Sequence, residues 1–200
     1  MIKLQLPILE AAIRELKMGD EVAISGLMVT ARDAAHKYIH ENWPDWLNPI
    51  MENSMIYHCG PVVKQHEDGS WSFVAAGPTT SIREEPYEAA VMEHYKVRAV
   101  IGKGGMGEKT LAGLAKSGGV YLHAIGGMAA SLAKSVVRVH DVYMLDELGV
   151  PEAFWHIEVK DFPAVVTMDS HGGSLHKSIK AKSDERSEER RVGKECRSRW

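Results

Sequence analysis

The pattern of hydrophobic and polar positions divides the chain into short elements of two kinds. Alternating or continuous apolar runs predict strands, which we expect at 21–31, 55–65, 70–77, 97–103, 119–127, 137–144, 154–159 and 163–168. Apolar residues at helical spacing predict helices, which we expect within 4–18 and at 33–43, 86–95, 107–118 and 128–136.

The order of these elements indicates the fold class. In the second half of the chain, strands alternate with helices of about ten residues, which is typical of βαβ units with parallel strands. Upstream, residues 55–65 and 70–77 predict a hairpin, and Pro151 and Pro163 are expected to interrupt the last strands. We find no internal repeat and no linker within residues 1–180, so the sequence predicts one mixed α/β domain.

Composition changes this picture mainly by exclusion. Hydrophobic residues make up 44% of the chain and charged residues 26%, as in ordinary globular proteins. The formal net charge of -3 argues against a nucleic-acid-binding protein, which would usually carry a basic face. No apolar run approaches the ~20 residues that cross a bilayer, and the first residues lack the apolar core and cleavage site of a secretory signal. We therefore expect a cytoplasmic protein with no nucleic-acid or membrane partner.

The last fifteen residues, 186–200, differ from the rest of the chain. They match the in-frame translation of a common sequencing adapter, and they contain six basic residues, three acidic residues and almost nothing apolar. We expect this segment to be a disordered, non-native tail, and we exclude it from the fold prediction. The remaining chain then has a formal net charge of -6, and we expect that its natural C-terminus is missing.

The cysteine count limits the cofactors that the chain can hold. The full sequence has two cysteines, Cys59 and Cys196, which form neither a disulfide framework nor a Cys-x-x-Cys pair. An iron–sulfur cluster normally needs three or four thiolates, so this chain alone cannot bind one. Cys59 is expected to be a small buried side chain and not a nucleophile.

Two arginines follow predicted strands at turns that suit anions. Arg32 stands where a predicted helix begins, and free backbone N–H groups and a partial positive charge favour anions there. Considered alone, this turn is better explained by Asp33 capping the helix and a solvated Arg32. Arg83 follows Thr79 and Thr80, whose hydroxyls could accompany a bidentate contact between the guanidinium and a carboxylate.

A third cation, Lys103, lies in the glycine-rich turn 101–107 after an apolar strand. The turn lacks the Gly-x-x-x-x-Gly-Lys-Ser/Thr spacing of a phosphate loop, so a nucleotide-binding domain is the weaker interpretation. Ligands of open α/β sheets bind at the carboxyl ends of the strands, where glycines let the backbone come close. Three cations at three strand ends suit a substrate with two carboxylates. No acidic cluster for Mg²⁺ accompanies them, which disfavours nucleoside triphosphates.

The ten histidines raise the question of a metal site. His36 and His40 are spaced i, i+4 on a predicted helix, but the glutamate of a His-Glu-x-x-His motif is absent. His171 lies in a glycine turn and could be an acid/base group, although a solvated loop explains it better. We expect no metal ligand in this chain.

Three motifs occur in order along the sequence: Val29-Thr30-Ala31-Arg32-Asp33-Ala34-Ala35-His36-Lys37, Gly77-Pro78-Thr79-Thr80-Ser81 and Ile101-Gly102-Lys103-Gly104-Gly105-Met106. Together they resemble the β-subunit, or C-terminal domain, of class I iron–sulfur fumarate hydratases and L(+)-tartrate dehydratases, from about Leu4 to about His176. The resemblance implies a swivelling β/β/α domain, here residues 1–180. It also implies an α-subunit that carries a [4Fe–4S] cluster on three cysteines, in an (αβ)2 hetero-oligomer.

The resemblance implies roles for five residues. Arg32, Thr80, Arg83 and Lys103 would bind the carboxylates of a small dicarboxylate, and Thr79 would be the base that removes the C–H proton. The open iron of the partner's cluster would act as a Lewis acid on the substrate hydroxyl. The implied reaction is the reversible dehydration of L-tartrate to oxaloacetate or of malate to fumarate. Because elimination builds negative charge on a substrate carboxylate, fixed cations there stabilise the transition state.

One departure from the family pattern bears on the substrate. Fumarases of this class usually continue the threonine motif with Gly-Arg-Met-Asp, whereas this chain has Ile82-Arg83-Glu84-Glu85, which is closer to the tartrate branch. The sequence therefore leans toward tartrate or a related hydroxy-diacid. The alternative from another class is a stand-alone dicarboxylate-binding module without catalysis. A cysteine-bearing partner encoded nearby would favour the enzyme.

Overall fold

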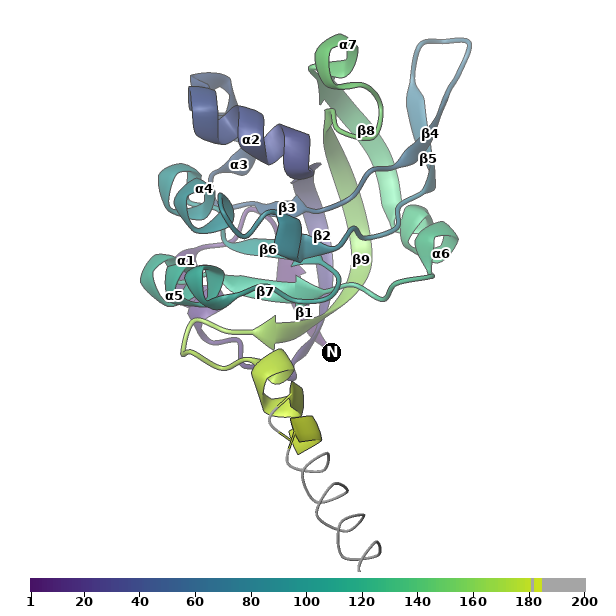
Figure 1. The fold of residues 1–200 in the computed structure, drawn as a ribbon. Helices are drawn as coiled ribbons and strands as arrows, with labels where there is room; N and C mark the ends of the chain where they lie inside the picture. Colours follow the sequence, from purple (N-terminus) through teal and green to yellow (C-terminus); the bar gives the residue numbers. More distant parts are fainter. Residues whose placement is uncertain (181, 185–200) are drawn as a thin grey trace, which may run out of the picture.

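The computed structural model describes residues 1–180 and 182–184, and the predicted tail 186–200 lies outside the described residues. Within them, a sheet of seven strands and a separate two-stranded hairpin are surrounded by short helices (Figure 1). The strands are β1 (Ile2–Gln5), β2 (Glu21–Thr30), β3 (Met55–Tyr57), β4 (Val62–Gln65), β5 (Trp71–Ala75), β6 (Ala99–Gly102), β7 (Val120–His123), β8 (Val136–Tyr143) and β9 (Phe154–Met168). Before β9 the helices are α1 (Glu10–Arg14), α2 (Asp33–Asn42), η1 (Asp45–Leu47), α3 (Asn48–Met51), η2 (Ser81–Arg83), α4 (Glu88–Tyr95), α5 (Glu108–Ser117), α6 (Ala129–Lys134) and α7 (Leu145–Leu148), and residues 175–180 are also helical.

Five of the strands close into a small barrel. β2, β3, β6 and β7 lie side by side in parallel. β9 runs antiparallel to them and pairs with both β7 and β2, which closes the ring. β1 pairs with the first half of β2, and β8 pairs with the first half of β9. The mixed α/β class and the parallel βαβ order predicted for the second half of the chain are confirmed.

Two local predictions are wrong. The run 55–65 is not one strand, because β3 belongs to the barrel whereas β4 pairs with β5 in the separate hairpin. The runs 154–159 and 163–168 form one strand, β9, although Pro163 lies within it. On one side β9 pairs with β8 up to Val159 and with β7 from Val165, so Pro163 falls between the two partners. Its missing N–H therefore removes no ladder hydrogen bond on that side.

Apolar side chains form two clusters. One fills the barrel and includes Trp155, Tyr57 and Phe162, all fully buried. The other lies between the barrel wall and the helices α2, α4 and α5, and includes Ile39 and Tyr95. In Figure 1 these three helices lie on the same flank of the barrel.

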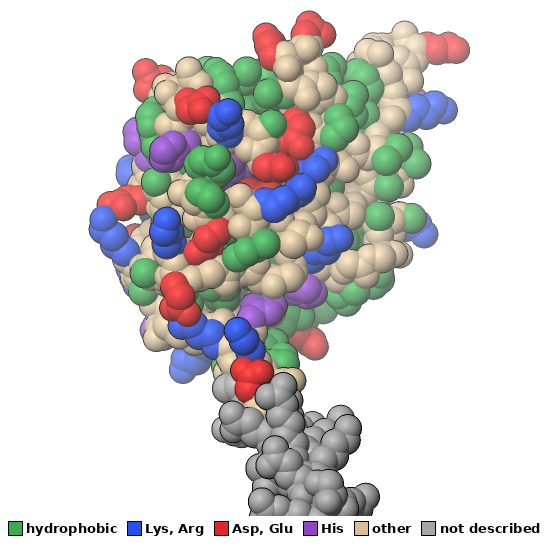
Figure 2. All heavy atoms as spheres, viewed as in Figure 1, with side chains coloured by type: hydrophobic (Ala, Val, Ile, Leu, Met, Phe, Trp, Pro, Cys, Tyr) green, Lys and Arg blue, Asp and Glu red, His purple; other side chains and the backbone are tan. Residues whose placement is uncertain are grey.

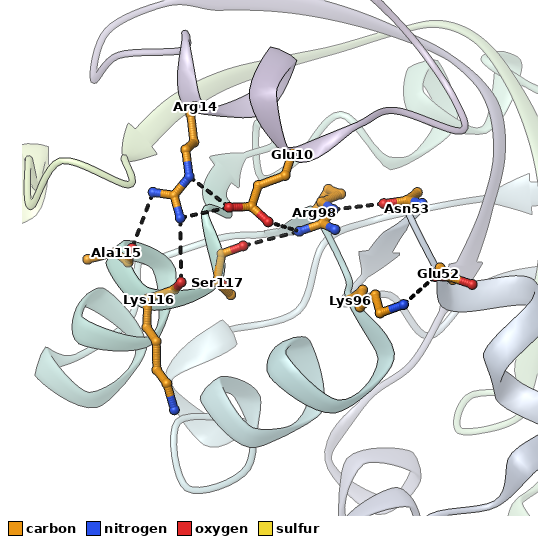
Figure 3. A network of polar contacts seen from close by, with 9 residues as sticks. All are labelled: Glu10, Arg14, Glu52, Asn53, Lys96, Arg98, Ala115, Lys116 and Ser117. Atoms are coloured by element: carbon orange, nitrogen blue, oxygen red, sulfur yellow. Dashed lines mark hydrogen bonds and ion pairs between the residues drawn. The ribbon is translucent and has the colours of Figure 1, made fainter.

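A polar network lies at the opposite ends of these strands, where β6 begins (Figure 3). The nearly buried Arg98 donates to Asn53 Oδ1 at 2.9 Å, to Ser117 O at 3.1 Å and to Glu10 Oε2 at 3.1 Å. A buried guanidinium requires such partners, because an unpaired buried charge is costly. The network therefore joins α1 to the end of α5 and has a structural role.

Within the described residues, no helix is long and apolar enough to cross a membrane.

The glycines and prolines flanking the helices explain how several of them end. Trp43 adopts a left-handed conformation with φ 47° at the end of α2, directly before Pro44, which cannot continue a helix. Gly118 ends α5 in the same way, with φ 71°.

Candidate functional site

The predicted site residues follow the carboxyl ends of neighbouring parallel strands. Arg32 follows β2, and Lys103 follows β6 directly. Thr79 and Thr80 belong to the segment 78–81, which lies alongside the ends of β3 and β6 through bridges between Cys59 and Pro78 and between Thr80 and Lys103. Because parallel strands end at the same edge of a sheet, these turns form one region of the surface.

Backbone hydrogen bonds fix the segment 78–81 in this position. Thr79 N donates to His58 O at 2.7 Å, and Lys103 N donates to Thr79 O at 3.1 Å. Ser81 N donates in turn to Lys103 O at 3.1 Å. The Thr79 hydroxyl also donates to His58 O, at 3.2 Å. The threonine turn and the lysine turn are therefore held together as adjacent strands would be.

Two of the predicted cations share one carboxylate. Arg83 Nη1 lies 3.5 Å from Asp33 Oδ2, and Arg32 Nε lies 3.8 Å from Asp33 Oδ1 and 3.3 Å from Glu152 Oε1. In Figure 2, basic and acidic side chains lie side by side over the amino end of α2. The Arg32 and Arg83 side chains are thus brought together at the start of α2, with acidic partners that an anionic ligand would have to replace or share.

The third cation, Lys103, forms no ion pair among the described residues and is partly exposed. Its amine is therefore available to an anion, as a point charge beside the threonine turn. Gly60 makes room for another cation, because a Cβ atom there would lie 2.5 Å from Arg32 Nη1. The glycine thus allows the Arg32 guanidinium to lie against the backbone.

A histidine that the sequence interpretation missed lies beside Lys103. His123 is the last residue of β7 and pairs in register with Gly102. Its Nδ1 atom is buried without a hydrogen-bond partner among the described residues, and burial lowers the pKa of its imidazole. The His176 ring lies 6.5 Å from it, and burial lowers the pKa of that ring too. Both are expected to be neutral at pH 7, so His123 can offer a neutral donor or acceptor to a ligand.

The glycine-rich turn does not leave a free helix N-terminus. The carboxylate of Glu85 accepts hydrogen bonds from Gly107 N at 2.7 Å, Lys109 N at 2.9 Å and Thr110 N at 3.2 Å, and from the Thr110 hydroxyl at 2.6 Å. It therefore occupies the position at the start of α5 where a phosphate would bind. This arrangement argues against the nucleotide-binding interpretation. It also ties the chain just after the threonine loop, residues 79–83, to α5.

We expect Glu85→Ala to lower the free energy of unfolding by about 2–3 kcal/mol, since it removes a charged cap and leaves N–H groups of α5 without partners. Urea denaturation measures this change. The matched control is Glu108→Ala in the first turn of the same helix. Glu108 is largely exposed and pairs with Lys177 at the surface, so its loss should cost no more than about 0.5 kcal/mol. Equal losses in the two variants would show that Glu85 does not cap the helix.

Beneath the cationic turns lies a buried polar cluster that the sequence interpretation also missed. One oxygen of Glu88, Oε2, lies 3.1 Å from His36 Nε2 and 3.0 Å from His58 Nε2. The other ring nitrogen of His58 lies 2.8 Å from Ser81 Oγ, which also accepts from the Tyr121 hydroxyl at 3.0 Å. His36, His58 and Glu88 are fully buried.

The cluster changes the protonation of its members. Burial disfavours the charged form of each group, but the Glu88 carboxylate raises the pKa of His36 above its ordinary value. Against the same desolvation, His36 and His58 hold the pKa of Glu88 below its ordinary value. Glu84 is buried with both oxygens unpaired among the described residues, and burial raises the pKa of its carboxyl. The arrangement therefore favours an imidazolium–carboxylate pair at His36 and Glu88.

The same three side chains bear on the metal question. The candidate ligand atoms of His36, His58 and Glu88 lie within 4.8 Å of one another. The pair considered from the sequence does not form, because His36 is buried in this cluster while His40 is exposed and contacts the rings of Trp43 and Tyr87.

The residues present do not suit an iron–sulfur cluster. Cys59 is buried, and burial raises the pKa of its thiol to about 12, so it is not a thiolate at neutral pH. The whole sequence has two cysteines, fewer than the three or four that such clusters need. Cys59 is buried as the sequence predicted.

His171 has a different environment from that of the cations. Its Nε2 atom lies 2.7 Å from Arg14 O on α1. The turn around it is held by Asp169, which accepts from Met18 N, His171 N and Gly173 N. These contacts favour the loop role over an acid/base role.

Comparison with known proteins identifies the family of this chain. A family model described as "Fumarase C-terminus" matches residues 1–179. The chain belongs to this family. The resemblance of the three motifs to fumarate hydratases and tartrate dehydratases is confirmed, because the relatives carry these hydro-lyase names.

Three relatives illustrate the range of the family. The chain is 55% identical over 187 residues to a putative class I fumarate hydratase of Geobacillus stearothermophilus, covering 93% of this chain and 35% of that protein. It is 45% identical to a putative L(+)-tartrate dehydratase subunit beta of Methanocaldococcus jannaschii, covering 85% of this chain and 88% of the relative. It is 35% identical to the L(+)-tartrate dehydratase subunit beta of Escherichia coli K12, covering 86% and 85%. The chain thus spans about a third of the first relative but most of the two β-subunits.

Proposed function

We propose that this chain is the β-subunit of an iron–sulfur-dependent hydro-lyase that reversibly dehydrates a hydroxy-dicarboxylate, either L-tartrate to oxaloacetate or malate to fumarate. The observation that carries the proposal is that three cation-bearing turns, at Arg32, Arg83 and Lys103, meet at one edge of the barrel in a member of this family. Three fixed cations match a substrate with two carboxylates better than a monoanion.

The proposed roles are those that the resemblance to the family implies, and the positions of the side chains support them. Arg83 and Arg32 would bind one or both carboxylates in place of Asp33, and Lys103 would add a point charge next to Thr80. As negative charge grows on the carboxylate beside the reacting carbon, these preorganised cations stabilise the transition state more than the ground state. Thr79 is proposed as the base for the C–H proton. Its hydroxyl donates to His58 O, so it would act as a base only as the alkoxide, after losing that proton.

The partner supplies what this chain lacks. Because its cysteines are too few for a cluster, we propose an α-subunit that holds a [4Fe–4S] cluster, in an (αβ)2 assembly in the cytoplasm. This subunit would dock onto the edge of the barrel that carries Arg32, Arg83 and Lys103, which we call the cationic edge. When bound, the cluster supplies Lewis acidity toward the substrate hydroxyl. We also propose that residues 1–180 are the swivelling β/β/α domain of the family and that 186–200 is not native.

The proposal is tested by searching beside the gene for a cysteine-rich subunit, co-expressing the chain with it and assaying fumarate, malate and both tartrates. Turnover of at least one diacid is expected, with tartrate favoured by Ile82-Arg83-Glu84-Glu85. Binding of a diacid without turnover, and no cysteine-rich neighbour, would favour the stand-alone binding module instead.

The proposal that the partner holds the iron–sulfur cluster gives a further prediction. The purified chain alone should be colourless and should show no hydratase activity, because it cannot hold the cluster. Absorbance spectra and iron analysis of the isolated chain and of the complex measure this difference. A brown chromophore with stoichiometric iron on the isolated chain would contradict the proposal that the α-subunit holds the cluster.

A further inference from the structure

We propose that His36, Glu88 and His58 form a positioning element. It holds the Arg32 turn and the threonine loop, residues 79–83, in a fixed position relative to each other. The three side chains come from α2, from α4 and from the residue after β3, and they meet beneath the cationic edge. The inference rests on the proposed function, since it explains how the proposed carboxylate-binding residues are kept in place.

The first arm of this element runs from Glu88 to the Arg32 turn. His36 Nδ1 lies 2.8 Å from the carbonyl oxygen of Arg32. A carbonyl oxygen only accepts, so Nδ1 carries the proton and Nε2 is the atom that faces Glu88 Oε2. Any shift of Glu88 is thereby transmitted through the His36 ring to the backbone of Arg32.

The second arm runs from the same carboxylate oxygen to the threonine loop. The His58 ring links Glu88 Oε2 to Ser81 Oγ, and the His58 carbonyl oxygen accepts from Thr79 N. Gly102 makes this link possible, because a Cβ atom at that position would overlap the Ser81 hydroxyl and lie 3.2 Å from His58 Nδ1. One carboxylate thus connects both turns that carry the arginines.

The geometry favours a positioning role over a metal site or a catalytic one. Glu88 Oε2 is hydrogen-bonded to His58 Nε2 at 3.0 Å and lies at an ion-pair separation of 3.1 Å from His36 Nε2. All three side chains have no exposed surface, so a substrate at the surface cannot touch them. Full burial also gives them a low local dielectric, in which the hydrogen bonds are strong and directional.

Backbone hydrogen exchange of the full chain tests the element without reference to activity. We expect Glu88→Gln to speed exchange of the Thr79, Ser81 and His36 amides at least tenfold, relative to the amides of β6. The matched control is Glu93→Gln, on the same helix α4, where the side chain is exposed and pairs with Lys116. It should leave all of these rates within twofold. Unchanged exchange of both turns in a folded Glu88→Gln protein would overturn the proposal.

Kinetics of the complex with the α-subunit provide the second measurement. Because the cations it positions act mainly in the transition state, Glu88→Gln should lower kcat/KM for the diacid at least tenfold, mainly through kcat, whereas Glu93→Gln should change kcat/KM by no more than twofold. An unchanged kcat/KM in a folded Glu88→Gln complex would overturn the positioning role. If the wild-type complex has no hydro-lyase activity, the proposed function fails, and the exchange experiment still decides the positioning element.

A milder variant covers the case in which Glu88→Gln does not fold. Ser81→Ala cuts the second arm alone, so exchange should quicken at Thr79 and Ser81 but not at His36. Faster exchange at His36 as well, or at none of the three, would contradict two separate arms. One stoichiometric equivalent of zinc in the purified protein would also overturn the proposal, since the cluster would then be a metal site.

Discussion

Replacing Arg83 or Lys103 with alanine should each lower kcat/KM for the diacid at least a hundredfold in the complex with the α-subunit. Removing one preorganised partner of a developing anion costs roughly 10²–10³ in rate where the donor acts in the transition state. Both side chains project from turns that are hydrogen-bonded to each other, so neither can be replaced by a neighbouring cation without moving the backbone. Steady-state kinetics on the reconstituted enzyme measure the effect.

The matched control for these variants is Lys116→Ala. Lys116 is an exposed cation on α5 whose partner is Glu93, so its removal changes the net charge equally without touching the site. Its kcat/KM should stay within twofold of wild type. Losses below tenfold for both Arg83→Ala and Lys103→Ala would show that these side chains do not bind the substrate carboxylates.

The second large effect concerns stability and its dependence on pH. We expect Glu88→Gln to lower the free energy of unfolding by about 3 kcal/mol near pH 6, because it leaves the buried His36 without its carboxylate partner. The matched control, Glu93→Gln, removes a surface pair and should cost no more than about 0.5 kcal/mol. Urea denaturation of both variants and of wild type at several pH values measures the difference.

The sign of the pH dependence follows from the two pKa shifts. His36 has a raised pKa in the folded protein. Its contribution to the free energy of unfolding is therefore fully present below its ordinary pKa of 6.5 and is lost as the pH rises through the raised pKa. Glu88 has a lowered pKa in the folded protein. Its contribution to the free energy of unfolding is therefore fully present above its ordinary pKa of 4.5 and is lost as the pH falls through the lowered pKa. The difference in the free energy of unfolding between wild type and Glu88→Gln should therefore be largest between about pH 4.5 and 6.5 and should become smaller at alkaline pH.

Other titratable groups face this pair from the surrounding elements. They are His58 after β3, Glu84 directly after the threonine loop and Tyr121 on β7. All three side chains remain in the Glu88→Gln variant. A gap of constant size from pH 5.5 to 9.5 would contradict the assignment of an imidazolium at His36.

The cationic edge could be predicted from sequence because each of its parts is local. Lys103 follows a short apolar run and is flanked by glycines, and Arg32 follows a strand and precedes a helix start. Strand ends of parallel βαβ units share one edge, so their proximity follows from the fold class alone. The roles of these side chains in binding a substrate stay predictions.

The buried cluster could not be predicted in this way, although signals were present. Glu88 lies on the same face of α4 as Val91, Met92 and Tyr95, all of which are buried. A charged residue on the apolar face of a helix indicates a buried partner. The partners, His36 and His58, come from separate segments, and local spacing carries no information about their meeting.

The closure of the barrel was likewise beyond local pattern. Pro163 predicted a break, and only the order of partners along β9 explains why the strand continues past it. Similarly, the apolar run from Met55 gives no sign that it divides between barrel and hairpin, since both halves are strand-like. Pairing between distant segments decided both outcomes.

A crystal structure of the chain with its α-subunit and a bound diacid tests the central claim most directly. We expect one carboxylate of the ligand within hydrogen-bond distance of the Arg83 guanidinium, and a carboxylate of the same molecule within reach of the Lys103 amine. Arg32 should turn from Glu152 toward the ligand. A diacid bound at the iron with both Arg83 and Lys103 directed away from it would contradict the account.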